Sequence, residues 1–278
     1  MRNRNMWILI ALVAAQALVR AQWLNHPAPG TPRTPDGKPN LSARTPRAAD
    51  GRPDLSGVWQ TVSAPPDELE RLIPGGVNGA GEDGPSQYFL NILADFKPEE
   101  APIRPDAAAS YRKRYQNFAK ESPLSHCLPT GVLMAETAPA PYKIVQLPGL
   151  TLMLYERDTN FRQVYTDGRQ LPDDPQPDWL GYSVGKWDGD SLVVDTVGFN
   201  DRSWLDARGH THSEALHLTE RFRRLDFGHM EVQVTIDDPK TYTRPFNVKL
   251  RQRLLPDSDV LESFCAENER DLAHFEGK

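Results

Sequence analysis

The sequence predicts a mainly β protein whose antiparallel strands close into a meander barrel. From residue 142 onwards, apolar residues recur at every second position. Met230, Val232, Val234 and Ile236, for example, alternate with polar residues. Alternation of this kind gives each strand one apolar face and one wet face, which excludes a parallel α/β sheet. Turn signals separate the alternating stretches, and closure into a barrel protects the strand edges that such a meander would expose.

Turn residues set the boundaries of the expected strands. Pro148 and Gly149 form a turn pair, and Asp188 with Gly189 is the strongest short hairpin signal in the chain. We therefore expect a short strand at residues 57–60 and about nine more from residue 142, joined in sequential hairpins. Their ranges are 143–147, 150–156, 161–166, 181–187, 191–197, 216–224, 230–236, 246–254 and 260–265.

The chain before these strands has helical and irregular patterns. Residues 86–96, 106–121 and 130–136 are expected to form a few short helices, the first of them capped by Ser86. Residues 22–56 are rich in proline and glycine, and residues 31–42 recur in modified form as residues 45–56. We expect this segment to be an extended proline-rich arm or a spacer in front of a barrel domain that spans residues 57–278.

The first 21 residues have the pattern of a secretory signal peptide. Arg2 and Arg4 precede an apolar stretch from Met6 to Ala17, and a cleavage site follows that ends at Ala21. The apolar stretch is shorter than the roughly 20 residues that span a bilayer, although an uncleaved anchor is the alternative. We therefore expect a periplasmic or secreted protein with no membrane span after cleavage.

Charge and cysteine content narrow the function classes. The 278-residue chain has a net charge of -6 and no basic stripe, which argues against a nucleic-acid partner. It contains two cysteines, Cys127 and Cys265. In an oxidising compartment they either pair or remain as two buried thiols. No C-x-x-C motif is present, which argues against a redox role.

One stretch of the chain carries a family resemblance. It runs from Tyr182 to Asp201 (YSVGKWDGDSLVVDTVGFND) and continues in residues 212–216 (HSEAL) and 219–224 (TERFRR). In these segments the chain resembles an uncharacterised family of secreted bacterial proteins, and the likeness covers most of residues 57–270. That family resembles lipocalin-like (calycin) barrels in its hairpin succession and in its Gly-x-Trp entry, here residues 57–59. The resemblance implies a barrel with a central cavity and implies no particular activity.

The densest polar cluster follows Asp201 and permits a metal site. On extended backbone, His210, His212 and Glu214 would share one face, roughly 7 Å apart in successive steps. Two imidazoles and a carboxylate can hold an iron or zinc ion facially. The His-x-His pair resembles the first cupin motif in part, but the acid comes too early and no downstream histidine motif follows. The sequence therefore assigns no cofactor.

The same cluster also permits acid–base chemistry without a metal. His212 can act as a base whose tautomer is set by Glu214 or Asp206. Glu220 shares the face of Leu218 and Phe222. It therefore either points into the core with a partner, or a bulge reverses the register. A hydrogen-bonded loop explains the histidines equally well, and a buried, paired glutamate is structural more often than catalytic.

Aromatic residues indicate a third kind of site, a cavity for an apolar or aromatic ligand. The candidate ligand-binding residues are Tyr155, Tyr182, Trp187, Trp204 and Arg221, with Tyr142, Tyr165 and Trp179 in the same aromatic set. Core filling is the alternative for most of the aromatic residues. Residues 181–185 fit the string G-x-S-x-G, but they lie in an expected strand and not in a strand-to-helix turn.

Three function hypotheses follow from these patterns. The first is an exported barrel that binds a small, partly apolar molecule in its lumen. The second is an acid–base or metal-dependent enzyme (isomerase, cyclase, lyase or hydrolase) that uses residues 210–220. The third is a structural or partner-binding envelope protein that uses the proline-rich segment. Convergence of His212, Glu214 and Glu220 on a solvent-connected pocket would favour the enzyme.

Overall fold

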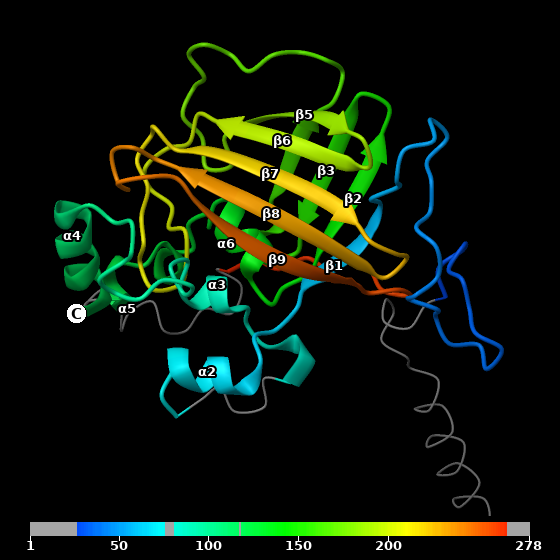
Figure 1. Ribbon diagram of the computed structural model, residues 1–278, viewed down its shortest axis with the longest axis horizontal. Helices are drawn as coiled ribbons and strands as arrows, with labels where there is room; N and C mark the ends of the chain where they lie inside the picture. Colours follow the sequence, from blue (N-terminus) through cyan, green and yellow to red (C-terminus); the bar gives the residue numbers. More distant parts are fainter. Residues whose placement is uncertain (1–26, 76–80, 117, 266–278) are drawn as a thin grey trace, which may run out of the picture.

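A computed structural model describes residues 27–75, 81–116 and 118–265 of the chain, and its main body is a closed barrel of nine strands (Figure 1). The strands are β1 Gly57–Thr61, β2 Tyr142–Leu147, β3 Leu150–Tyr155, β4 Phe161–Tyr165, β5 Tyr182–Asp188, β6 Ser191–Val197, β7 His217–Arg224, β8 His229–Asp237 and β9 Phe246–Leu254. β1 pairs with β2 on one edge and with β9 on the other, which closes the barrel. The prediction of a mainly β protein built on a barrel is confirmed. The predicted signal peptide lies outside the described residues.

Two features of the barrel differ from the expected meander. No strand forms at residues 260–265, because β8 and β1 already occupy both edges of β9 and leave no free edge to pair with. β4 and β5 pair in parallel, and only at Val164 and Tyr165 of β4. The linker at residues 166–181 contains three prolines, which cannot donate backbone hydrogen bonds, so the chain crosses back to the start of β4 instead of forming a hairpin.

Short helices lie around the barrel. They are α2 Pro66–Leu72, α3 Gln87–Leu90, α4 Pro105–Gln116, α5 Phe118–Glu121 and α6 Val132–Thr137, with 3₁₀ turns at Gly81–Asp83, Pro123–His126 and Arg157–Thr159. Ser86 caps α3 by accepting a hydrogen bond from the Phe89 N–H, as expected. The helix stops at Leu90 and not at residue 96, because the Asn91 side chain accepts the N–H of Leu93 and competes with helical bonding. The sequence pattern did not reveal α2. Within the described residues, no helix has both the length and the apolar character needed to span a bilayer.

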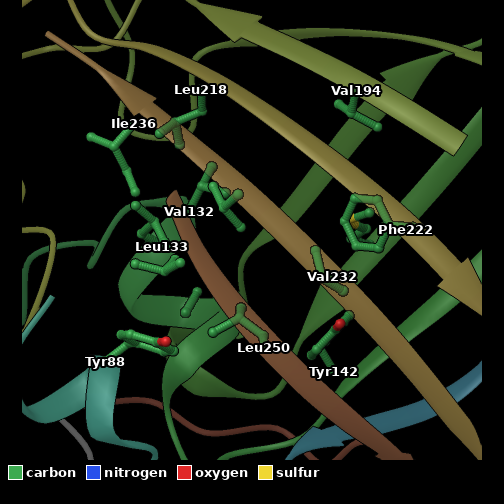
Figure 2. Close-up of a cluster of buried hydrophobic side chains, with 14 of the residues drawn as sticks. Tyr88, Val132, Leu133, Tyr142, Val194, Leu218, Phe222, Val232, Ile236 and Leu250 are labelled. Atoms are coloured by element: carbon green, nitrogen blue, oxygen red, sulfur yellow. The ribbon is translucent and has the colours of Figure 1, made fainter. Parts of the chain in front are cut away.

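One end of the barrel is closed by α6. All six side chains of this helix are buried. Val132 and Leu133 lie among the inward-facing side chains Leu218, Ile236 and Leu250 of β7, β8 and β9 (Figure 2). Side chains, and not solvent, therefore fill the interior at this end.

Residues 27–56 lie against the other end, beside the turn between β7 and β8 (Figure 1). The two sequence repeats use equivalent arginines to contact the barrel. Arg33 pairs with Asp257 after β9, and Arg47 pairs with Asp190 in the turn between β5 and β6. Leu55 is fully buried, and its carbonyl accepts the indole N–H of Trp59 at 2.9 Å. The repeat therefore supplies two matching anchors on the barrel.

A disulfide joins Cys127 and Cys265, whose Cα atoms are 5.3 Å apart. It ties the segment after β9 to the chain just before α6. Thr159 and Ser263 exchange two further hydrogen bonds along the same segment. The chain after β9 is thus held at the end of the barrel where β4 begins.

Candidate ligand-binding site

A buried charge cluster lies inside the barrel at the end closed by α6. Nη1 of Arg162 in β4 is 3.0 Å from Oε1 of Glu136 in α6 and 3.1 Å from Oε1 of Glu220 in β7. These three side chains are at most 2% exposed. The Tyr155 hydroxyl donates to Glu136 Oε1 at 2.8 Å. One cation thus faces two carboxyl groups in a region where an uncompensated charge is costly.

Protonation of Glu136 resolves this imbalance. Burial, together with repulsion from Glu220, raises the pKa of the Glu136 carboxyl well above its usual value. Its Oε2 has no hydrogen-bond donor among the described residues, so a negative charge on this oxygen would be unsupported. Burial also raises the pKa of the Tyr155 phenol. With Glu136 neutral, the charges of Arg162 and Glu220 balance.

We expect Glu136→Gln to remove a pH dependence of stability. The folded pKa of Glu136 lies above the unfolded value, so the folded protein keeps a proton that the unfolded chain releases. The stability from this group is fully present below the unfolded pKa and is lost as pH rises through the folded pKa. In urea unfolding from about pH 5 to about pH 9, the wild-type protein should lose stability relative to Glu136→Gln. Glu214→Gln, at an exposed position, should follow the wild type. Parallel curves for wild type and Glu136→Gln would contradict the assignment.

A pocket of about 390 Å³ opens beside the charge cluster, where β4 and β5 diverge. Its volume falls in the range of small-molecule sites. Arg162 and Ser183 are its most buried lining residues, at 2% and 1% exposed, and form the inner wall. The remaining lining residues are Pro129, Asn160, Phe161, Gln163, Tyr165, Asp178, Trp179, Leu180, Gly181 and Tyr182. The pocket therefore joins an aromatic outer part to a buried polar inner wall.

The residues just before β5 keep β4 and β5 apart at the pocket. Asp178 lies alongside Phe199 beyond the end of β6, which draws the chain before β5 away from β4. Gly181 follows with a φ of 62°, and a Cβ at this position would lie 2.7 Å from the carbonyl oxygen of Val197. Only glycine fits this close approach in a left-handed conformation. β5 consequently pairs with β4 only at Ser183 and Val184.

Aromatic rings in the outer part are held in place by arginines. The rings of Tyr165 and Tyr182 stack with their centroids 5.4 Å apart. The Arg169 guanidinium lies 3.8 Å from the Tyr165 ring, and its Nη1 donates to the Tyr182 hydroxyl at 3.1 Å. Arg202 lies 4.9 Å from the Trp179 ring. Such contacts preorganise the rings, which lowers the entropic cost of binding a ligand.

Of the predicted ligand-binding residues, Tyr182 lines this pocket. Tyr165 and Trp179 from the wider aromatic set line it as well. The other predicted residues lie elsewhere. Tyr155 belongs to the charge cluster, Trp187 packs against the core, Trp204 is buried, and Arg221 pairs with Asp188 at the surface.

The residues of the predicted metal triad have separate partners. His210 Nδ1 is 2.5 Å from Asp206 Oδ2, and its ring stacks on Tyr111. Asp206 also accepts the backbone N–H of Gly209 and of His210, so this segment forms a loop and not the extended strand on which the triad depended. Glu214 is exposed. Across the described ranges, no group of three or more His, Cys, Asp or Glu side chains is placed to hold a metal ion.

His212 contacts a serine and not a carboxylate. Its Nδ1 is 3.0 Å from the Ser213 carbonyl oxygen and therefore carries the hydrogen, so Nε2 accepts the hydroxyl of Ser203 at 2.8 Å. Burial lowers the pKa of His212, which favours the neutral ring. The void beside this pair measures about 10 Å³, about the space for one water molecule. The predicted catalytic residues His212, Glu214, Glu220 and Asp206 are therefore not brought together around a shared pocket.

Two residues of the charge cluster, Arg162 and Glu136, were not predicted from the sequence. Arg162 did carry a signal, because in the strand at 161–165 it shares the inward face with Val164 while Phe161 and Gln163 point outwards. An inward arginine on one strand and the inward Glu220 on another could have been matched as a buried pair. Glu136 carried no such signal, because only tertiary packing inserts α6 into the barrel.

Comparisons of this chain with protein-family models, curated proteins and solved structures find no match.

Proposed function

We propose that this protein is exported and binds a small, partly apolar molecule in the pocket between β4 and β5. The observation that carries the proposal is a preorganised aromatic pocket with Arg162 and Ser183 buried in its inner wall. Small-molecule sites typically combine apolar walls with a few convergent polar groups. The site lies at one end of the barrel, beside the gap between β4 and β5, because side chains fill the interior. In holding a ligand at one end, the barrel would resemble lipocalin-like barrels.

Two observations support the exported location. The N-terminal pattern of residues 1–21 is typical of a signal peptide. The bond between Cys127 and Cys265 is of the kind that persists in oxidising compartments.

Toluene and acetophenone can test the pocket as small probes in two-dimensional NMR titrations. We expect shifts concentrated at residues 161–165 and 178–183. Gln163→Trp should abolish them, because Gln163 lines the pocket and a larger ring at this position would fill it. The matched control is Gln233→Trp, since Gln233 is also an exposed mid-strand glutamine but lies on β8. Shifts located elsewhere, or equal loss in both variants, would refute the proposal.

A further inference from the structure

The hydrogen bonds of the inner wall restrict what the pocket can bind. We infer that the ligand is a neutral, planar molecule that presents a hydrogen-bond acceptor, such as a carbonyl oxygen, to the hydroxyl of Ser183. This inference rests on the proposed function and specifies the ligand class of the same pocket.

Arg162 has no donor left for a ligand. A guanidinium carries five N–H donors. Nε donates to Ser183 Oγ at 2.9 Å, and Nη1 donates to Glu136 and Glu220. Nη2 donates to Thr196 Oγ1 at 2.7 Å and to Glu220. All five hydrogens are therefore used within the barrel.

Ser183 and Thr196 together retain one unused hydroxyl hydrogen. Their oxygens are 3.0 Å apart, so one hydroxyl donates to the other. Thr196 is fully buried and is not part of the pocket lining, and Ser183 is the only acceptor for its hydroxyl among the described residues, so a hydrogen pointed elsewhere would be left unbonded. The favourable arrangement has Thr196 donating to Ser183, which leaves the Ser183 hydrogen free.

In this arrangement Ser183 can only donate. Its two lone pairs accept from Arg162 Nε and from Thr196, and no acceptor for its own hydrogen lies within bonding distance in the described part of the chain. Ser183 is almost fully buried but is one of the residues that line the pocket, so the pocket is the place from which an acceptor for this hydrogen could come. The matching ligand group is an acceptor, and a ligand donor would find no lone pair on this oxygen.

The charges at the inner wall favour a neutral ligand over a charged one. Glu220 balances the charge of Arg162, so a ligand carboxylate at the inner wall would lose its hydration without gaining a free cation there. A ligand cation would approach the Arg162 guanidinium in the inner wall, and Asp178, the carboxylate among the lining residues, is exposed, where an ion pair contributes little. A neutral acceptor avoids both costs. The aromatic side chains of Trp179 and Tyr182 suit a planar body.

Four one-ring probes separate these classes: acetophenone, toluene, benzoate and benzylammonium. Dissociation constants come from NMR titrations of the whole protein, followed at residues 161–165 and 178–183. We expect acetophenone to bind about five- to tenfold more tightly than toluene, which corresponds to one hydrogen bond. Benzoate and benzylammonium should bind more weakly than toluene.

Ser183 variants test the origin of this preference. Ser183→Ala should bring the acetophenone-to-toluene ratio close to one, and Ser183→Thr, which keeps the hydroxyl, should restore it. Because both probes are measured on the same variant, the acetophenone-to-toluene ratio is insensitive to general effects of the substitution on the fold. If Ser183→Ala does not fold, Ser183→Thr supplies the test. A preference that survives Ser183→Ala, equal binding of both probes to the wild type, or tightest binding of benzoate would overturn the inference while leaving the pocket intact. Failure of toluene and acetophenone alike would overturn the proposed function as well.

Discussion

Replacing Arg162 with methionine should lower the free energy of unfolding by about 3–5 kcal/mol. The substitution leaves the carboxyl groups of Glu136 and Glu220 inside the barrel without a cation, and both are at most 1% exposed. It also removes the donors to Ser183 and Thr196. Urea unfolding of the purified protein at neutral pH measures the difference.

Arg221→Met is the matched control for this experiment. Arg221 neighbours Glu220 in β7 but points outwards, where it pairs with the exposed Asp188. An exposed pair of this kind contributes about 0–1 kcal/mol. Combining Arg162→Met with Glu136→Gln and Glu220→Gln should recover much of the lost stability, because no buried charge remains without a partner. Equal losses in Arg162→Met and Arg221→Met would show that the buried cluster contributes no more than a surface pair.

Loss of the bond between Cys127 and Cys265 should lower the free energy of unfolding by about 5 kcal/mol in the chain-entropy model. The expectation is large because 138 positions separate the two cysteines, so the bond strongly restricts the unfolded chain. The measurement compares urea unfolding of the wild type with and without a reductant. A variant with both cysteines changed to alanine should match the reduced wild type.

The same double variant controls for side effects of the reductant. Its free energy of unfolding should not change when the reductant is added, because it has no disulfide. A loss below about 1 kcal/mol would contradict the entropic account. Such a result would indicate that the segment after β9 detaches locally when the bond is absent, while the barrel remains folded. Hydrogen exchange at residues 255–265 would then show faster exchange than in the barrel strands.

The sequence alone determined most of the strands and the faces that they bury, although the strand expected at residues 260–265 does not form. Alternation with a period of two is a local property, so Met230 to Ile236 could be assigned an inward face without knowledge of the neighbouring strands. The same reasoning put Glu220 on the face of Leu218 and Phe222, with a bulge as the alternative, and the structure buries it there. The partner of Glu220, which is Arg162 on β4, could not be predicted from the sequence of β7 alone.

Only the tertiary structure decided the site. The parallel contact of β4 with β5, the insertion of Glu136 by α6 and the pairing of Cys127 with Cys265 all join segments that are distant in sequence. The expected metal triad failed for a different, local reason, because hydrogen bonds to Asp206 fold the chain around His210 into a loop. Local patterns report which side of a strand is apolar. The pocket depends on which strands meet and where they separate, and that is settled by packing of the whole chain.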